Sequence, residues 1–343
     1  MQACEPGQQA QEDELEILHL PVEPISIAQV REAERRAEES ELRVLIGIPA
    51  YNEQQNIGKT IALLARDCPS YDILVISSGS TDMTDSIVRE MMNRYSNVEL
   101  ISEPERRGKS RALSGLLRKL NSGYDVVVYM GADNIPEEGA IDKLLQRLTS
   151  DERIGLVGGR PVPLNHLNTT AGWMTHLLWG THHGLSIRNR PKISGELCAI
   201  RAGAVYEVPP TIINDDAYLQ FIFEMNGYSV AYEPNAVVYL RGPETIRDFF
   251  SQRYRVTIGH YQVEQLLGSK LPTTHAIRNI RTAWRARRKV GRLKEISWFS
   301  FFLAVSGLVV AKALIDFYLL RKLPYKWKMI ESTKTLISEQ SCS

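Results

Sequence analysis

The sequence has little cysteine, and its cysteines are too far apart to form a recognisable site. Cys4, Cys68, Cys198 and Cys342 show no CxxC spacing, so neither a zinc site nor a dithiol redox motif is indicated. Residues 1–20 also lack the basic and apolar parts of a secretion signal. These absences predict a reduced, cytoplasmic environment.

The chain has almost no net charge, with a formal value of +1 at pH 7, but its charges gather in two segments. Residues 1–41 are rich in Glu and Gln, whereas residues 278–294 contain no acid. The basic residues of the second segment are Arg278, Arg281, Arg285, Arg287, Arg288, Lys289, Arg292 and Lys294. Such asymmetry favours a surface that faces phosphates. Because no nucleic-acid-binding motif accompanies it, we expect a membrane and no nucleic acid as the partner.

Two glycine-rich phosphate loops are missing. The turn after the first apolar run reads Pro49-Ala50-Tyr51-Asn52-Glu53 and contains no glycine, which excludes the dinucleotide-binding fingerprint. Gly108-Lys109-Ser110 matches the end of a P-loop, but Glu103 stands where the first glycine of that loop belongs. The sequence therefore contains neither of these two phosphate-binding loops.

Apolar runs alternate with segments of helical periodicity through the first half of the chain. The runs at 44–48, 71–76, 98–101 and 126–130 indicate buried strands, and apolar residues at helical spacing lie between them. Further short strands are expected at 230–232 and 236–240. Because parallel neighbours need crossover helices, this alternation predicts an α/β protein with helices on both faces of a sheet.

A single carboxylate follows the fourth of these strands. The run 126–130 continues as Gly131-Ala132-Asp133-Asn134 before Pro136 ends the segment. Ligands of open α/β sheets bind beyond the carboxyl ends of such strands. Asp133 is therefore expected at a functional site.

Several segments, in this order and spacing, resemble one known family. They are Ile48-Pro49-Ala50-Tyr51-Asn52-Glu53, Gly79-Ser80-Thr81-Asp82, Arg107-Gly108-Lys109-Ser110-Arg111-Ala112-Leu113, Gly131-Ala132-Asp133-Asn134, Asn214-Asp215-Asp216, Gly227-Tyr228 and Gln252-Arg253-Tyr254-Arg255. The family is that of the inverting glycosyltransferases of family 2, which includes polysaccharide synthases and lipid-directed sugar transferases. The resemblance implies a GT-A fold, a doubly wound mixed sheet with a Rossmann-like nucleotide-binding half and an acceptor half.

The resemblance also implies which residues bind the donor nucleotide. These residues are Pro49, Ala50, Tyr51, Glu53, Ser77, Lys109, Arg111 and Ala132. Tyr51 is placed like the family residue that stacks on the base, although a turn aromatic that packs on the sheet is the alternative. Lys109 and Arg111 are equally compatible with a solvated basic patch. Ser77 stands where the family usually has a base-binding aspartate, so either the donor is not a UDP-sugar or hydroxyls replace that carboxylate.

Asp133 resembles the second aspartate of the family's Asp-x-Asp motif, which holds a divalent cation against the two phosphates of the donor. A hard oxygen ligand suits Mg²⁺ or Mn²⁺, and such an ion stabilises a leaving diphosphate. The alternative is a strand-end aspartate that only caps a loop. Gly131 replaces the first aspartate of the motif.

Asp216, next to Asp215, resembles the general base of the family. Displacement at an anomeric carbon needs a carboxylate that takes the proton of the acceptor hydroxyl, and an adjacent like charge raises its pKa. The alternative is a helix N-terminus with favourable acids.

Gln252-Arg253-Tyr254-Arg255-Val256 resembles the Gln-x-x-Arg-Trp motif of processive and lipid-directed members, with Val256 in place of the tryptophan. Gln252, Arg253 and Arg255 are therefore expected to bind diphosphate or acceptor, although an amphipathic basic helix is an alternative. Ser194 and Gly195 resemble the loop that closes one wall of the acceptor site.

Trp173, His176, Trp179, His182 and His183 recur at near-helical spacing. No metal-ligand spacing is present among them, so a packed or interfacial helix is favoured over a metal cluster, and an acceptor-binding role is the alternative.

The sequence suggests five regions. They are an acidic extension at 1–41, a GT-A catalytic domain at 42–265, a basic helical segment at 266–295, a hydrophobic membrane-associated segment at 296–322 and a basic or polar tail at 323–343. Residues 296–311 are uncharged but short for a spanning helix, and Lys312 and Asp316 would lie inside the bilayer. We expect a protein at the cytoplasmic face of a membrane, held by a peripheral, re-entrant or single-span anchor.

The function implied is that of an inverting, metal-dependent glycosyltransferase. It would move a sugar from a nucleotide-sugar donor to a lipid-linked or glycan acceptor by single displacement, with Mg²⁺ or Mn²⁺ as cofactor. The alternative is a catalytically degenerate member that binds a nucleotide sugar or a partner protein, motivated by Gly131 and Ser77.

Overall fold

The computed structural model describes residues 42–188, 191–268 and 276–321. The expected acidic extension at 1–41 and the tail at 323–343, with Cys4 and Cys342, lie outside the described residues. Cys68 and Cys198 are buried free thiols.

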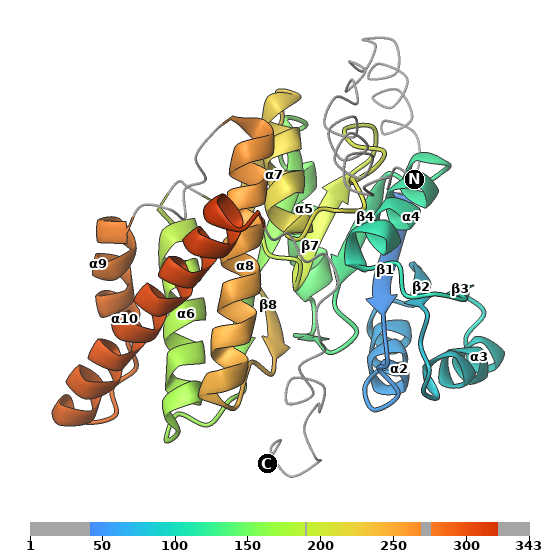
Figure 1. The fold of residues 1–343 in the computed structure, drawn as a ribbon. Helices are drawn as coiled ribbons and strands as arrows, with labels where there is room; N and C mark the ends of the chain where they lie inside the picture. Colours follow the sequence, from blue (N-terminus) through green and yellow to red (C-terminus); the bar gives the residue numbers. More distant parts are fainter. Residues whose placement is uncertain (1–41, 189–190, 269–275, 322–343) are drawn as a thin grey trace, which may run out of the picture.

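The described residues contain one mixed sheet of eight strands in the order β3-β2-β1-β4-β7-β6-β8-β5 (Figure 1). Its strands are β1 (Val44–Ala50), β2 (Asp72–Ser78), β3 (Val98–Glu103), β4 (Val126–Met130), β5 (Ile135–Pro136), β6 (Ile154–Pro163), β7 (Leu197–Arg201) and β8 (Ser229–Leu240). The first four are parallel, whereas β7 runs antiparallel to both β4 and β6. The change of direction between β4 and β7 joins the parallel half of the sheet to its mixed half, so the predicted mixed doubly wound sheet is confirmed.

Helices cover both faces of the sheet because its central strands are apolar on both sides. Helices α2 (Ile57–Asp67), α3 (Thr84–Arg94) and α5 (Ala140–Thr149) pack on one face with Ile46 and Val128. Helices α4 (Lys109–Asn121) and α7 (Asp215–Met225) pack on the other with Leu45 and Val127. Alternate residues of each strand thus belong to different cores, as the period of two requires.

One strand differs from expectation. The runs 230–232 and 236–240 were predicted as separate strands, but β8 is continuous from Ser229 to Leu240. It pairs with β6, and the register shifts between Gly158 and Arg160, where an irregularity absorbs the extra residues of β8.

Four further helices pack beside the mixed half of the sheet and form a core of their own. They are α6 (Thr170–Ser186), α8 (Ile246–Leu267), α9 (Ala276–Ala286) and α10 (Arg292–Leu314), which continues as the π-helical segment η3 (Ile315–Leu319). In Figure 1, α10 runs obliquely past α6 and α8, while α9 lies along α6. Trp173, Phe249 and Phe299 are buried between them.

The helix from Arg292 to Leu319 has 28 residues and a mean hydropathy of 2.0 in its most apolar window, which makes it long and apolar enough to cross a membrane. Lys312 and Asp316, the two charges expected to disfavour a position inside a bilayer, are paired with each other. Lys312 Nζ lies 2.6 Å from Asp316 Oδ2, and the Tyr254 hydroxyl on α8 donates to the same carboxylate. The buried Asp316 therefore faces α8, while Leu293, Leu308 and Leu319 are exposed.

We expect Tyr254→Phe to destabilise the folded chain by about 1–2 kcal/mol, because Asp316 loses the hydroxyl that donates to its buried carboxylate. Urea unfolding of the purified full chain measures this change. Tyr318→Phe is the control, since Tyr318 is 56% exposed and its hydroxyl makes no hydrogen bond among the described residues. Equal stability of the two variants would show that the contact between α8 and η3 does not depend on this hydroxyl.

Candidate active site

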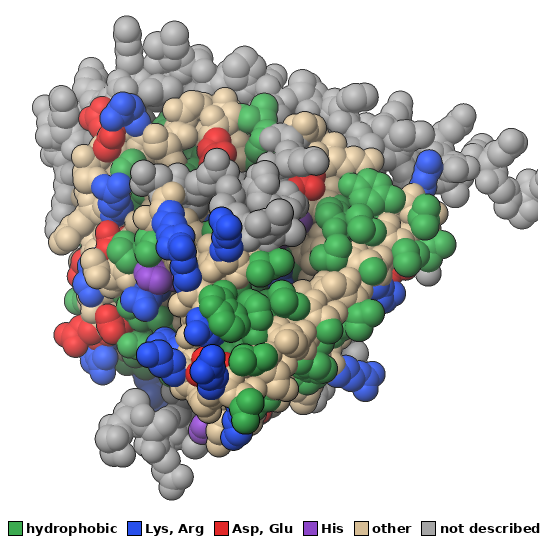
Figure 2. Space-filling view, turned by 90° about the vertical axis from the view of Figure 1, so that its left-hand side faces the viewer, with side chains coloured by type: hydrophobic (Ala, Val, Ile, Leu, Met, Phe, Trp, Pro, Cys, Tyr) green, Lys and Arg blue, Asp and Glu red, His purple; other side chains and the backbone are tan. Residues whose placement is uncertain are grey.

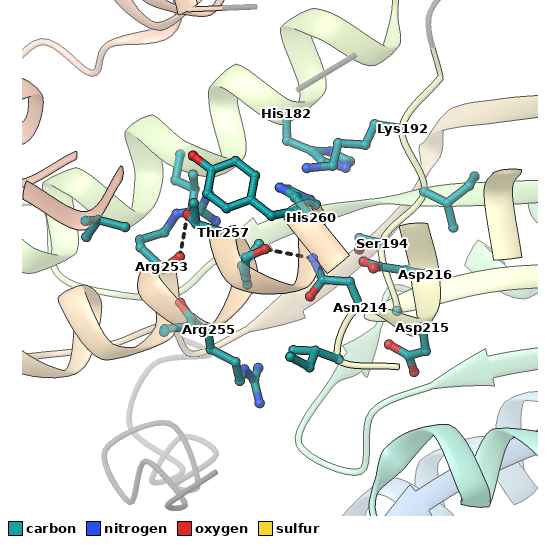
Figure 3. Close-up of a pocket in the computed structure, with 18 of the residues that line it drawn as sticks. His182, Lys192, Ser194, Asn214, Asp215, Asp216, Arg253, Arg255, Thr257 and His260 are labelled. Atoms are coloured by element: carbon teal, nitrogen blue, oxygen red, sulfur yellow. Dashed lines mark hydrogen bonds between the residues drawn. The ribbon is translucent and has the colours of Figure 1, made fainter. Parts of the chain in front are cut away.

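The start of α4, the first turn of α7 and one side of α8 line a common cavity, which has a volume of about 1070 Å³. Of the residues singled out by sequence, it is lined by Lys109, Ser194, Gly195, Asp215, Asp216, Gln252, Arg253 and Arg255. Figure 3 shows Ser194 in the loop before β7, Asp215 and Asp216 at the start of α7, and Arg253 and Arg255 on α8. Asp133 itself does not line this cavity, although its neighbour Glu196 does.

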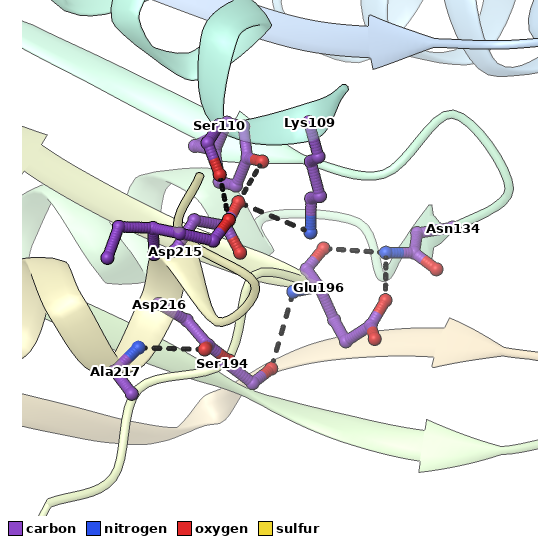
Figure 4. Close-up of polar contacts among 10 residues, drawn as sticks. Lys109, Ser110, Asn134, Ser194, Glu196, Asp215, Asp216 and Ala217 are labelled. Carbon is purple, nitrogen blue, oxygen red and sulfur yellow. Dashed lines mark hydrogen bonds and ion pairs between the residues drawn. The ribbon is translucent and has the colours of Figure 1, made fainter. Parts of the chain in front are cut away.

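Asp133 has an acidic neighbour that sequence reasoning missed. Burial and then the charge of Glu196 raise the pKa of Asp133 to about 6. Glu196 is held by Asn134, whose Nδ2 donates to its carbonyl oxygen at 2.8 Å and to its Oε2 at 2.9 Å (Figure 4). Two carboxylates that repel each other at the end of β4 provide an oxygen-rich place for a cation.

Gly131 explains how this arrangement fits. A Cβ at Gly131 would lie 2.9 Å from Asn134 Nδ2 and 2.9 Å from Asp133 Oδ1. The space next to the backbone of Gly131 is thus occupied by the side chains of Asp133 and Asn134. The first aspartate of the family motif is absent here. A second acid, Glu196, comes instead from another element, just before β7.

Asp215 is a buried carboxylate with fixed partners. The Tyr129 hydroxyl on β4 donates to Asp215 Oδ2 at 2.8 Å, and Lys109 Nζ on α4 lies 3.8 Å from the same oxygen. Burial lowers the pKa of Lys109, but Asp215 and Glu196 outweigh burial, so the pKa is raised. Lys109 passes close over Gly195, where a Cβ would lie 2.7 Å from Nζ. Asp215 therefore connects α7 to β4 and α4.

Within the described part of the chain, Asp216 has no such partner from another element. Its Oδ1 accepts the backbone N–H of Ala217 at 2.7 Å, and the side chain faces the cavity. Burial and then the charge of Asp215 raise the pKa of Asp216, which agrees with the sequence-based expectation for a paired acid. Lys192 and Lys109 both act against this shift, so both cations lie near Asp216.

Asn214 fixes the start of α7 against α8. Its Nδ2 donates to the carbonyl oxygen of Val256 at 2.8 Å, at the position where the family has tryptophan. A Cβ at Gly259 would lie 2.6 Å from the Asn214 Cγ. The absence of a side chain at Gly259 thus allows the close approach that positions Asp215 and Asp216.

The expected base-binding residues lie at the ends of β1 and β2, outside the cavity lining. The Tyr51 ring lies under the Arg106 guanidinium, 4.1 Å from Cζ to the ring centroid. Ser77 is fully buried, and its hydroxyl donates to Ser80 Oγ at 2.9 Å. Hydroxyls, and no carboxylate, therefore occupy the place of the base-binding aspartate, while Arg106 lines the cavity and links it to Tyr51.

The other residues expected to bind the donor make contacts within the protein or lie outside the cavity lining. Glu53 is buried and accepts from Asn56 Nδ2 at 3.1 Å. The Ala132 carbonyl accepts from Thr60 Oγ1 at 2.9 Å. Pro49 and Ala50 belong to β1 and pair with β2. Arg111 lies on α4 and does not line the cavity. Donor contacts of these residues stay predictions.

The cavity residues that were not predicted as site residues include Lys192, Glu196, His182 and His260. His260 follows Arg253 and Val256 on α8 at helical spacing, so this periodicity could have identified it. Lys192 precedes Ser194 by two positions, and Glu196 follows Gly195 directly. His182 belonged to the aromatic and histidine group, but its direction was not predictable.

That group is not a metal cluster, because its histidines point to different places. His176 Nε2 lies 2.8 Å from the Asn165 carbonyl oxygen, and His183 Nδ1 lies 2.9 Å from the Tyr232 hydroxyl. Trp179 and His182 line the cavity. No three His, Cys, Asp or Glu side chains gather as a metal site in the described ranges of the chain. The favoured packed helix is present, with two members at the cavity.

Comparison with known families agrees with the resemblance seen in the sequence. Residues 45–207 match the family model described as glycosyl transferase family 2. The family recognised from the sequence is confirmed, and with it the enzyme class, a glycosyltransferase.

Among individual proteins, the poly-beta-1,6-N-acetyl-D-glucosamine synthase of Staphylococcus aureus (strain COL) is 25% identical over 226 residues, which are 63% of this chain and 54% of that protein. The corresponding synthase of Staphylococcus epidermidis is 23% identical over 226 residues, with the same coverage of 63% and 54%. The chain thus spans about half the length of these curated relatives.

A mannosyltransferase from Pyrobaculum calidifontis, solved in complex with GDP-Man and Mn²⁺, has the same fold. The TM-score is 0.57 at 20% identity, over 86% of this chain and 95% of that one. The expected GT-A type fold is thereby confirmed.

We expect Gly259→Ala to lower the turnover number by about tenfold or more, because the new methyl group displaces Asn214 and tilts the first turn of α7. Steady-state rates with a nucleotide-sugar donor measure the effect. Ser251→Ala on the same helix is the control, since Ser251 is exposed, lies outside the cavity lining and donates only to the Arg247 carbonyl oxygen. Equal rates for the two variants would show that Asn214 does not position the catalytic turn.

Proposed function

We propose that the cavity transfers a sugar from a nucleotide-sugar donor to a lipid-linked or glycan acceptor, with inversion at the anomeric carbon. The observation that carries this proposal is the different state of two adjacent acids. Asp215 is bound to Tyr129 and Lys109, whereas Asp216 faces the cavity with a raised pKa. One acid is structural and the next is available as a base.

Asp216 takes the proton of the acceptor hydroxyl as the hydroxyl oxygen forms a bond to the anomeric carbon. The bond between that carbon and the diphosphate oxygen breaks, and its electron pair leaves with the nucleoside diphosphate. A base with a raised pKa lies nearer to the operating pH, which improves proton transfer. A single displacement of this kind inverts the anomeric carbon.

The cations around the site suit the diphosphate that leaves. Lys109 is raised in pKa by its acidic neighbours and stays charged, and Arg255 lies near enough to oppose that shift. Arg253 and Arg255 both face the cavity from α8 (Figure 3). Guanidinium groups bind phosphate oxygens in pairs and neutralise the charge that develops as the bond breaks.

Asp133 and Glu196 fit a divalent cation. Mg²⁺ and Mn²⁺ are often held by one or two carboxylates together with substrate phosphates, and two carboxylates meet at this point. Asp133 and Glu196 would hold the ion, which when bound supplies Lewis-acid stabilisation of the diphosphate. The Mn²⁺ and GDP-Man named for the mannosyltransferase of similar fold support the choice of this ion and of a nucleotide-sugar donor.

The membrane setting rests on α10. Its outward side exposes Leu293, Leu308 and Leu319, and basic residues precede it. Such a helix favours contact with anionic lipid, and we propose that it holds the enzyme at a cytoplasmic membrane face. The alternative function is a binding module without catalysis, and it is favoured by the loss of an acid at Gly131 and at Ser77. Glu196 beside Asp133 weakens the argument from Gly131, because it supplies a second acid there.

We expect Asp216→Asn to lower the turnover number by about a hundredfold or more while the KM for the donor changes little, because the amide cannot accept the proton. Rates are measured with Mn²⁺ and a donor panel that includes GDP-mannose and nucleotide-activated N-acetylglucosamine. Product analysis by NMR reports the anomeric configuration. Substantial residual turnover would overturn the base assignment, and retention of configuration would overturn the single displacement.

The pH profile gives an independent check. Because the pKa of Asp216 is raised, activity should fall on acidification at a higher pH than an ordinary aspartate requires. Asp215→Asn removes the neighbouring negative charge, so the acid limb should move to lower pH in this variant. An acid limb that stays in place would exclude Asp216 as the titrating base.

Asp133→Asn and Glu196→Gln should each raise the Mn²⁺ concentration for half-maximal rate by roughly tenfold or more, because each removes one negative charge from the expected cation site. Metal titration of the initial rate measures this requirement. Glu207→Gln is the control, since Glu207 pairs with Arg118 at the surface. If only Asp133→Asn changes the titration, Glu196 is not a ligand.

A further inference from the structure

Three aromatic rings meet where α8 packs against the segment η3, at one end of the cavity. The ring centroid of Tyr261 on α8 lies 5.9 Å from that of Phe317 and 5.8 Å from that of Tyr318. Phe317 is buried, and its ring meets that of Tyr318 edge to face at 4.9 Å. Tyr261 and Tyr318 both line the cavity. Two rings, supported by a buried third, therefore border this part of the cavity.

The backbone of η3 brings its two rings to the same partner. The Leu320 N–H donates to the Ile315 carbonyl oxygen at 3.0 Å, which is five positions earlier and not four as in an α-helix. Such a wide turn rotates consecutive side chains less, so Phe317 and Tyr318 both reach Tyr261 although they are neighbours in the sequence. Turns of this π-helical type are rare, and they occur frequently at functional sites.

A polar contact in the same segment holds these rings in place. Asp316 is buried, accepts from the Tyr254 hydroxyl on α8, and pairs with Lys312. Because a buried carboxylate that loses its partners is strongly destabilising, η3 is fixed in its rotation against α8. Phe317, the next residue, is thereby fixed as well. The aromatic surface exists before any ligand binds.

The rings lie beside the segment that leads into α7. Ile213 packs in the same apolar cluster as Tyr261. Gln262, the next residue on α8, accepts the Ile213 N–H at 3.0 Å and donates from Nε2 to the Thr211 carbonyl oxygen at 2.9 Å. Ile213 lines the cavity, three positions before Asp216. A molecule that lies on the two tyrosines is therefore on the side of the cavity from which the proposed base projects.

Polar groups flank Tyr261 along the same face of α8. Thr257 precedes Tyr261 by four positions and Glu264 follows it by three, and both line the cavity. These spacings place all three side chains on one face of a helix. Hydroxyl and carboxylate oxygens accept hydrogen bonds from hydroxyl groups. The surface thus combines aromatic faces with a few hydrogen-bonding groups, as binding sites for small molecules do.

We infer that Tyr261 and Tyr318 form a stacking platform for a neutral pyranose ring of the acceptor. A pyranose with equatorial substituents carries axial C–H bonds on each face, and these polarised hydrogens are attracted to the negative face of an aromatic ring. Its hydroxyl groups, at the ring edge, match Thr257 and Glu264. A hydrocarbon chain would leave these polar groups unmatched, and a phosphate would be repelled by the carboxylate. The inference rests on the proposed transferase function and narrows its acceptor to a molecule that presents a sugar ring.

The exposure of Tyr318 has a second physical explanation, which is contact with a membrane. Figure 2 shows hydrophobic side chains gathered on the side of the molecule where α9 and α10 lie, with Lys and Arg side chains beside them. Leu308 and Leu319 are exposed on this last helix. Tyr318 is also exposed, at 56%, but unlike these two leucines it lines the cavity. A sugar probe and a lipid probe distinguish the two explanations.

The test is saturation-transfer NMR on the full chain in nanodiscs, with empty nanodiscs as the blank. The probes are methyl β-glucopyranoside and N,N′-diacetylchitobiose. Saturation of the aromatic protons of the protein should reach the axial protons of one ring face at least roughly twice as strongly as those of the other face, because only one face lies on a tyrosine. Sorbitol has similar hydroxyl groups but no ring, so it should receive little saturation.

Variants identify the rings that make the contact. Tyr318→Leu and Tyr261→Leu should each weaken binding of N,N′-diacetylchitobiose by about threefold to tenfold and remove the preference for one face, because leucine offers no ring. Tyr318→Phe keeps the ring and should bind the sugar as the unchanged chain does. Tyr206→Leu is the matched control, since Tyr206 is 46% exposed and lies outside the cavity lining.

Equal saturation of both ring faces, or equal affinities of Tyr318→Leu and Tyr206→Leu, would overturn the inference. It is also overturned if Tyr318→Leu changes only the partition of the chain into vesicles of phosphatidylcholine and phosphatidylglycerol, because Tyr318 is then a membrane anchor. Mn²⁺-dependent cleavage of the donor is assayed on the same preparations. Donor cleavage without sugar contact removes the platform and leaves the transferase function intact. Sugar contact without donor cleavage removes the transferase function and, with it, the acceptor role.

Discussion

The buried carboxylate of Asp215 is the contact on which the site depends. It receives the Tyr129 hydroxyl from β4 and lies near the Lys109 ammonium of α4, so it joins one strand and two helices. A buried charge that loses such partners is strongly destabilising, and this requirement holds the first turn of α7 at the carboxyl edge of the sheet. Because Asp215 is turned inward, the next residue is turned to the cavity. The position of Asp216, its electrostatic environment and the path of Lys109 over Gly195 all follow from this contact.

The first half of the fold could be predicted from the sequence because its strands and helices are marked by local residue patterns. Continuous apolar runs such as 126–130 are typical of strands with two covered faces, and helical periodicity between them identifies the crossovers. The direction of β7 was less accessible, since antiparallel pairing with β4 depends on contacts between segments far apart in the chain. The same reason explains why Glu196, Lys192 and His260 were missed. Each acquires its place through tertiary contacts, and no motif marks it.

The departures from the family pattern have physical counterparts in the structure. Gly131 lacks a carboxylate, but Asn134 turns over it and holds Glu196 beside Asp133, so the number of acids at this edge is maintained by another element. Val256 lacks the aromatic ring of the motif, but its carbonyl receives Asn214 and fixes the catalytic turn. Ser77 is different, because its hydroxyl donates to Ser80 Oγ. Recognition of the base is therefore where this chain differs most from the pattern.

The last helix combines two demands that usually exclude each other. A helix that crosses or lies in a membrane must be apolar outside, whereas a helix that closes an active-site cavity must match polar groups within. Here Asp316 accepts from Tyr254 on α8 and also pairs with Lys312. Both charges are therefore paired with each other where the helix packs against the protein. Leu308 and Leu319 face outward, while Phe302 and Leu303 line the cavity. The same helix therefore presents apolar surface both to the outside and to the cavity.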